Sequence, residues 1–192
     1  PFFAYKRLGY LIDGNLSSLS DLNDDYLFVG KSGFDNSASL VNGRPHGGVA
    51  ILYKKSLGHF ITQINIASRR SCAVMVKLRS TTCFLCNVYL PVDFQSQSVV
   101  DPSYETTLDE IEGIMSATSC DDTILCGDFN TDFDRLNAQT RLLNDFIDRN
   151  NIMVGWNCNV AKKESTYVNL ALGHIIWSHV LHRSFSCKSS SV

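Results

Sequence analysis

The sequence contains 192 residues with a formal net charge of −2, and 44% of the residues are hydrophobic while 19% are charged. A chain of this size is most simply one domain with a sizeable core. The balanced charge argues against a coat-like nucleic acid binder, but it allows an enzyme that grips DNA locally. No apolar run comes near the roughly 18 residues that span a bilayer, so we expect no membrane partner.

Strand-like runs rich in β-branched residues follow one another along the chain. They cover residues 26–30, 47–53, 60–66, 72–78, 83–91 and 123–127, and two shorter runs follow at 165–169 and 174–181. The short polar turn between residues 78 and 83 predicts a hairpin from the two runs that flank it. Residues 1–10 show no clear strand register.

Two helices are predicted among these strands. The first begins at Asp101 and has apolar residues at helical spacing up to Met115. The second has them from Leu136 to Ile147 and ends near Asn150. Many strands with a few interposed helices predict a mixed α/β sandwich rather than a helical bundle.

The seven cysteines are scattered, and several of them lie within apolar runs. Cys83 and Cys86 form a C-x-x-C pair, but a zinc site of the ribbon type needs a second pair of ligands. In an extended segment this spacing also sends the two side chains to opposite faces. We therefore expect buried, reduced thiols and a reducing compartment, nuclear or cytoplasmic.

The clearest candidate site lies in CGDFN, residues 126–130, at the end of a buried run. In a strand, Asp128 and Asn130 would project to one side while Phe129 turns into the core. Ligands of α/β sheets gather at the carboxyl ends of strands. A carboxylate that orients a water or a metal, beside an amide that hydrogen-bonds a phosphate oxygen, suits hydrolysis of a phosphate ester. The same spacing also builds Asx turns, so a purely structural role stays open.

Two further stretches hold polar groups near strand ends. In NVYLP, Pro91 stops the strand and leaves Tyr89 at its end. That phenol is either a hydrogen-bond donor to phosphate or a half-buried strand residue. In GRPHGGVAILYKK, Arg44 and His46 lie in a glycine-rich turn that leads into a strand. By itself this stretch predicts only a turn followed by a strand, and Arg44 and His46 are the candidate substrate-binding residues that it holds.

The stretches GRPHGGVAILYKK, NVYLP, ILCGDFNTDF and STY, in this order, resemble the endonuclease/exonuclease/phosphatase superfamily. Within it the chain looks most similar to the apurinic-type endonuclease domain of non-LTR (LINE-like) retrotransposons, from about Leu11 to His179. The resemblance implies a four-layered α/β sandwich, with two mixed β-sheets flanked by helices. It also implies Mg²⁺-dependent hydrolysis of a DNA phosphodiester. Asp128 would align the attacking water, and Asn130 and Tyr89 would hold the phosphate.

The sequence departs from this family toward both ends. The family has a metal-binding glutamate in a QE motif, whereas residues 6–30 contain no glutamate and RLGYL stands roughly where the family has QEHWL. Ser178 takes the place of an orienting aspartate. His179 is either a strand residue or a remnant of the family's Ser-Asp-His motif. We therefore expect residues 1–183 to form an incomplete domain that lacks edge strands, with a polar, serine-rich tail at 184–192.

Three functions stay open from the sequence. The first is a DNA-nicking endonuclease, impaired in this copy, with the reverse transcriptase domain of a parent polyprotein as a partner. The second is a phosphatase or phosphodiesterase of the same superfamily. The third is a catalytically silent remnant that binds the DNA phosphate backbone or another partner. The pairs Lys54-Lys55, Arg69-Arg70 and Lys162-Lys163 could touch such a backbone, although basic pairs are usually only solvated.

Overall fold

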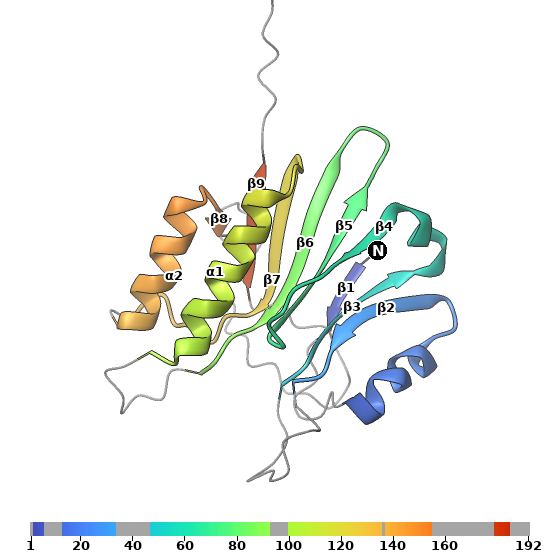
Figure 1. The fold of residues 1–192 in the computed structure, drawn as a ribbon, viewed down its shortest axis with the longest axis horizontal. Coiled ribbons are helices and arrows are strands. Elements are labelled where there is room, and N and C mark those ends of the chain that lie inside the picture. The colour runs from blue at the N-terminus through green and yellow to red at the C-terminus, as the bar shows by residue number, and fades with distance from the viewer. Residues whose placement is uncertain are drawn as a thin grey trace, which may run out of the picture.

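The computed structural model describes residues 2–5, 13–33, 47–92, 100–135, 137–154 and 179–184. Its strands are β1 (Phe2–Tyr5), β2 (Tyr26–Lys31), β3 (Val49–Lys54), β4 (Ile61–Ile64), β5 (Ser71–Lys77), β6 (Thr82–Tyr89), β7 (Asp122–Asp128), β8 (Met153–Val154) and β9 (His179–Ser184). The helical elements are the 3-10 helices η1 (Asp13–Leu22) and η2 (Lys55–Phe60) and the α-helices α1 (Pro102–Ala117) and α2 (Ala138–Arg149). The strands form a three-stranded sheet, β1-β3-β2, and a six-stranded sheet, β4-β5-β6-β7-β9-β8 (Figure 1).

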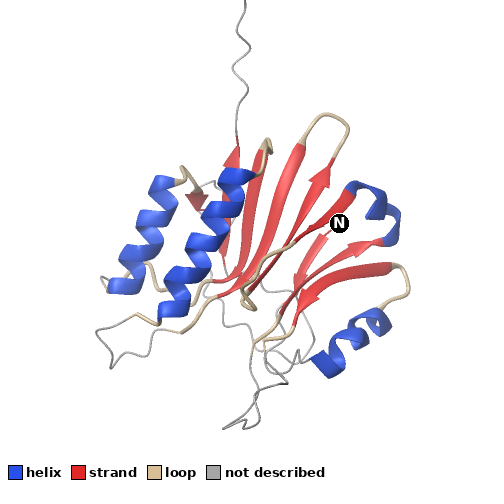
Figure 2. Ribbon diagram, viewed as in Figure 1, coloured by secondary structure: helices blue, strands red, loops and turns tan. Residues whose placement is uncertain are grey.

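The two sheets pack face to face, and helical elements cover their outer faces (Figure 2). Apolar side chains from both sheets fill the layer between them, namely Val29, Val49, Ile51, Cys72, Val74, Val76, Leu85 and Cys126. Helices α1 and α2 bury their apolar faces on the outer side of the larger sheet. On the far side, Leu19 of η1 packs against Ala50 and Leu52 of the smaller sheet. The predicted α/β sandwich of two sheets flanked by helices is confirmed.

Strand β5 shows why the larger sheet reads as a continuous apolar run in the sequence. Successive strand residues point to opposite faces. Val74 and Val76 point into the layer between the sheets, whereas Ala73 and Met75 point toward α1 and α2. Burying one such valine stabilises the fold by about 1.5–3 kcal/mol. A charged residue at any of these positions would therefore be buried, either in the layer between the sheets or beneath the α-helices.

The site is positioned by the pairing of β6 with its two neighbours. Strands β5 and β6 form the predicted hairpin, with Lys77 opposite Thr82 in an antiparallel register. Strands β6 and β7 are parallel, with Tyr89 opposite Asp128. Helix α1 lies between them in the chain and makes the crossover that a parallel pair requires. The carboxyl ends of β6 and β7 therefore meet at one edge of the sheet.

Both α-helices begin at side chains that cap them. Asp101 precedes Pro102 and accepts a hydrogen bond from the Ser103 N–H at 2.8 Å. Asn137 accepts one from the Thr140 N–H at 2.7 Å, so α2 begins at Ala138, two residues after Leu136, where the sequence placed its first apolar residue. No helix in the described part of the chain is long and apolar enough to cross a membrane.

The cysteines of the described residues are free, with Cys72, Cys86 and Cys126 buried. Cys83 packs in the layer between the sheets and Cys86 in the core beneath the helices, so the predicted opposite orientation is confirmed. Burial raises the pKa of Cys72 to about 12 and that of Cys83 to about 11. These thiols therefore stay protonated at neutral pH and are poor metal ligands.

Some elements differ from the sequence-based predictions. Strand β1 lies in residues 1–10, where no strand register was predicted, and pairs with β3 from Phe2 opposite Tyr53 onward. The element η1 and the two-residue strand β8 were also not predicted. The predicted strand at 165–169 and most of the one at 174–181 lie outside the described residues, and so do Lys162 and Lys163.

Candidate active site

Tyr89 and Asp128 end the two parallel strands and face each other across the ladder. The Leu90 N–H donates to the Asp128 carbonyl at 2.9 Å, which extends the pairing one residue past Tyr89. Both side chains are half-buried. A phenol that can donate a hydrogen bond and a carboxylate that can accept one are thus held at the edge where α/β sheets bind ligands.

Asp128 also shapes the turn that follows β7. Its Oδ1 accepts a hydrogen bond from the Asn130 N–H at 2.9 Å, which makes an Asx turn. Asn130 is in the left-handed region with φ of 48°, so the chain leaves the strand geometry there. Phe129 is fully buried, as predicted. The relative positions of the Asp128 and Asn130 side chains are therefore set by this turn and not by strand alternation. That the two residues act on one phosphate stays a prediction.

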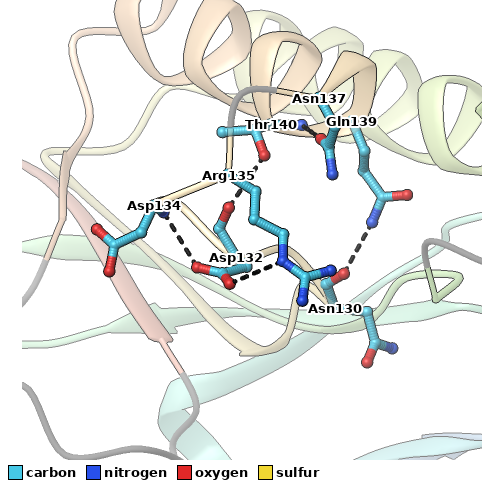
Figure 3. A network of polar contacts seen from close by, with 7 residues as sticks. All are labelled: Asn130, Asp132, Asp134, Arg135, Asn137, Gln139 and Thr140. Carbon is cyan, nitrogen blue, oxygen red and sulfur yellow. Dashed lines mark hydrogen bonds and ion pairs between the residues drawn. The ribbon is translucent and has the colours of Figure 1, made fainter. Parts of the chain in front are cut away.

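The Asn130 side chain is fixed against the neighbouring strand end. Its Nδ2 donates to the Leu90 carbonyl at 2.6 Å. Its own backbone carbonyl accepts from Gln139 Nε2 of α2 at 2.8 Å (Figure 3). An amide nitrogen has two hydrogens, so one of them remains to donate elsewhere. Asn130 can therefore hold the turn and still present a donor.

The loop between β7 and α2 is held by polar contacts at several points (Figure 3). Thr140 Oγ1 donates to the Asp132 carbonyl at 3.0 Å, and Asp132 Oδ1 accepts from the Asp134 N–H at 3.0 Å. Thr131 meets the Tyr104 hydroxyl of α1 at 2.6 Å, and burial raises the pKa of Tyr104. The residues after Asp128 are thus tied to both helices.

A close approach of the strands lies just below this edge. Gly127 has φ of +122°, and a Cβ placed there would lie 2.0 Å from the Val88 carbonyl oxygen. Only glycine fits this position. Asn87, which is 1% exposed, donates from Nδ2 to the Ala50 carbonyl at 2.9 Å and so links the two sheets. Gly127 lies in CGDFN and Asn87 in NVYLP, but nothing in these motifs indicated the close approach or the link between the sheets.

A pocket of about 350 Å³ opens at the same edge, between the two sheets. Its lining residues are Gly33, Gly47, Gly48, Ser68, Arg69, Arg70, Tyr89 and Ser103. A Cβ on Gly47 would lie 3.6 Å from the Tyr89 ring, and one on Gly33 would lie 2.3 Å from the Gly48 nitrogen. The glycines therefore let the loops of the smaller sheet close on the tyrosine. Two arginines and a phenol make this pocket suited to an anion.

The predicted site residues are brought together only in part. Tyr89, Asp128 and Asn130 meet at one edge, whereas Arg44 and His46 lie outside the described residues. His179 begins β9 and pairs with Gly127, next to Asp128 along the ladder. Sequence reasoning took the Arg69-Arg70 pair as one of three basic pairs and did not place it in the site.

A family model for the endonuclease/exonuclease/phosphatase family matches residues 9–183. The chain belongs to this family. The family match covers the glycine-rich turn and the strand ends that hold Tyr89 and Asp128. No match was found among curated protein sequences.

Solved structures of the family share the fold at low sequence identity. The human Nocturnin catalytic domain with bound sulfate has a TM-score of 0.55 at 12% identity, covering 94% of this chain and 68% of that one. D. rerio TDP2 complexed with a single-strand DNA product has a TM-score of 0.55 at 14% identity, covering 95% and 71%. The endonuclease domain of TRAS1, a telomere-specific non-LTR retrotransposon, has a TM-score of 0.52 at 12% identity, covering 83% and 67%.

The family is generally metal-dependent, and a metal site needs several ligands close together. Among the described residues, no group of three or more His, Cys, Asp and Glu side chains could hold a metal ion. Asp128 offers a hard oxygen ligand of the kind that Mg²⁺ prefers, but one carboxylate does not make a metal site. The described residues therefore do not make up a metal site of this family.

Proposed function

We propose that the chain is a phosphodiester hydrolase that acts on DNA, the nicking endonuclease of a LINE-like retrotransposon, and that its rate is low in this copy. The observation that supports this most directly is the pairing of Tyr89 with Asp128 beside a pocket that contains two arginines. Cleavage of a phosphodiester needs donors placed in advance for the charge that develops on the phosphate oxygens. It also needs an acceptor that orients the attacking water.

The chain's own residues would divide this work. Asp128 would align the attacking water through its carboxylate. Tyr89 would donate its hydroxyl hydrogen bond to a phosphate oxygen. Asn130 would donate its second amide hydrogen to the same group, since Leu90 takes the first. These roles match those that the sequence resemblance implies for the same three residues.

The low rate is inferred from the sequence. The first glutamate of the chain is Glu105, so the segment that matches the QE motif supplies no carboxylate of that kind, and Ser178 stands where an aspartate is expected. Each such group is worth orders of magnitude in rate, about 10²- to 10⁴-fold for a general base. We propose Mg²⁺ as the ion that supports the remaining activity. In this proposal the chain works in the nucleus with a reverse transcriptase domain of a parent polyprotein.

Nicking of supercoiled plasmid tests the proposal. Native protein with Mg²⁺ is expected to nick slowly, above the background of Asp128→Ala, and EDTA should abolish the difference. A native rate equal to that of Asp128→Ala would refute the hydrolase function. A rate like that of a complete endonuclease domain would refute the impairment. A panel that adds phosphomonoesters and lipid phosphodiesters separates the endonuclease from a phosphatase of the same family.

A second candidate function is a silent DNA-binding remnant. The two arginines of the pocket favour it, since they can bind phosphate whether or not the chemistry survives. DNA binding that persists in EDTA, together with nicking no faster than that of Asp128→Ala, would select this function over the hydrolase.

A further inference from the structure

The pocket owes its positive charge to one short loop. Residues 66–70, which we call the arginine loop, lie between β4 and β5 and end with Arg69 and Arg70 in the pocket lining. Within the part of the chain that the structure describes, the pocket lining includes no acidic side chain. The whole chain has a net charge of −2, so this local charge is not part of a generally basic surface.

The arginine loop is held from both sheets and from α1. Lys31 of β2 donates from Nζ to the Ile66 carbonyl and, at 3.0 Å, to the Ser68 carbonyl. Glu110 of α1 accepts from the Ala67 N–H and, at 2.8 Å, from the Ser68 N–H. Burial lowers the pKa of Lys31, although Glu110 opposes that shift. Two partly buried charges of opposite sign, Lys31 and Glu110, thus hold the backbone of this loop. Burying charges costs desolvation free energy, which indicates that a fixed loop conformation matters here.

The same contacts place Arg70 against Tyr89. The Tyr89 N–H donates to the Arg70 carbonyl at 2.8 Å, and the Arg70 N–H donates to Ser68 Oγ at 3.1 Å. Ser68 Oγ in turn meets Thr107 Oγ1 of α1 at 3.1 Å. The backbone of Arg70 is therefore bonded to the end of β6, and Arg70 is one of the residues that line the pocket.

Among the described residues, the acidic side chain that interacts electrostatically with Arg70 is held at the start of α1. Asp101 is the acidic group that interacts with Arg70 over distance, and its carboxylate accepts from the Ser103 N–H at 2.8 Å and the Ser103 hydroxyl at 2.7 Å. Those hydrogen bonds keep Asp101 on the cap of α1. Arg70 is half-buried and Arg69 is exposed, so the pocket has an inner and an outer positive group. Such a pair suits a ligand that has more than one anionic group.

We propose that Arg69 and Arg70 bind consecutive phosphate groups of one nucleic acid strand and hold that strand against Tyr89 without the help of a metal ion. This inference rests on the proposed function, since it takes the ligand to be a nucleic acid. A guanidinium makes paired hydrogen bonds with phosphate oxygens, and a loop fixed in advance loses little entropy on binding. The arginine loop is the element that gives the site its affinity for a strand.

Binding of a short fluorescein-labelled oligothymidylate in EDTA at fixed salt tests the inference. Arg70→Gln should weaken binding about tenfold, and the double variant with Arg69→Gln should weaken it further. The slope of log affinity against log salt should fall by about one for each arginine removed. An oligonucleotide with uncharged methylphosphonate linkages should bind weakly and equally to native protein and both variants.

The chain offers matched controls. Arg79 is exposed in the turn at the other end of β5, and Lys54 and Lys55 are exposed at the other end of β3. Arg79→Gln should change affinity less than about twofold, and so should the double variant Lys54→Gln with Lys55→Gln, because charges beyond a Debye length are screened. Equal losses in the control and loop variants would overturn the inference, as would a native protein that does not bind the oligonucleotide.

The two proposals fail in different ways. If plasmid is not nicked but binding of the oligonucleotide still depends on Arg69 and Arg70, the hydrolase function is refuted and the strand-binding role is supported. If nicking occurs and replacing either arginine changes neither oligonucleotide binding nor the nicking rate, the hydrolase function is supported and the strand-binding role of the arginines is refuted. Preferential loss of binding to phosphomonoesters rather than to the oligonucleotide in the Arg70→Gln variant would also overturn the inference.

Discussion

Replacing Asp128 separates the two tasks that its side chain has in this site. Its Oδ1 accepts the Asn130 N–H at 2.9 Å, which is a structural task, and its charge at the strand edge is a chemical one. Asp128→Asn keeps an acceptor oxygen and removes the charge. Asp128→Ala removes both.

The structure sets the size of each effect. Loss of a capping acceptor of this kind costs about 1 kcal/mol, so Asp128→Ala should lower the melting temperature by roughly 2–4 °C in a chain of this length. Asp128→Asn should stay within about 0.5 kcal/mol of native stability. Both variants should lose nicking activity about 100-fold or more. In EDTA, Asp128→Asn should bind DNA more tightly than native protein, because a repulsive charge near phosphate is gone.

Asp132 provides the matched control. Its Oδ1 accepts the Asp134 N–H at 3.0 Å, so the same kind of turn recurs four residues later, away from the pocket lining. Asp132→Ala should lose similar stability and keep its activity. Thermal melts, plasmid nicking and oligonucleotide titration on the same preparations decide the matter. An Asp128→Asn variant that nicks at the native rate, or one destabilised as much as Asp128→Ala, would refute the reasoning.

Three further substitutions test the fold around the site. Gly127→Ala should cost more than about 4 kcal/mol in denaturant unfolding, since its Cβ would lie 2.0 Å from the Val88 carbonyl oxygen; a native midpoint would contradict this close approach. Ser71→Ala should be neutral or stabilising by about 1 kcal/mol, because the fully buried Ser71 hydroxyl has no hydrogen-bond partner among the described residues. A clearly lower melting temperature for this variant would mean that the hydroxyl does have a partner. Hydrogen bonds from Arg149 lower the pKa of Glu112. The pair therefore stabilises the fold at any pH above the ordinary pKa of a glutamate, and this stabilisation is lost as the pH falls through the lowered pKa. Glu112→Gln should therefore be less stable than native by under about 1 kcal/mol at neutral pH and by less in acid, and a deficit that grows in acid would reverse the sign argument.

The central strands β5, β6 and β7 of the larger sheet could be predicted because both of their faces are buried. Residues 72–76 form an unbroken apolar run for that reason, and the hairpin turn after β5 shows in the polar residues that follow. Strand β1 has no such signal, because Phe2–Tyr5 forms a single short edge of the smaller sheet. The 3-10 element η1 was missed although Leu16, Leu19 and Leu22 recur at every third residue, the period of a 3-10 helix, because three leucines among serine, aspartate, asparagine and glycine make a weak apolar signal.

The candidate site was predictable at the level of residues but not of geometry. Tyr89 and Asp128 stood out as polar groups at strand ends, and the structure pairs them. The left-handed turn at Asn130 could not be foreseen, because strand alternation was the simplest assumption for residues 128–130. Arg70 was missed for a different reason: its place depends on contacts from Lys31 and Glu110, which are far from it in the sequence.

Helix α1 contacts both loops of the site from one face. Tyr104 meets Thr131 after β7, whereas Thr107 and Glu110 hold Ser68 in the arginine loop. These helix positions are three residues apart, so they lie along one side of the same rigid rod. Amide hydrogen exchange should consequently report the two loops as one cooperative unit: an oligonucleotide that slows exchange at residues 66–70 should slow it at residues 129–131 as well.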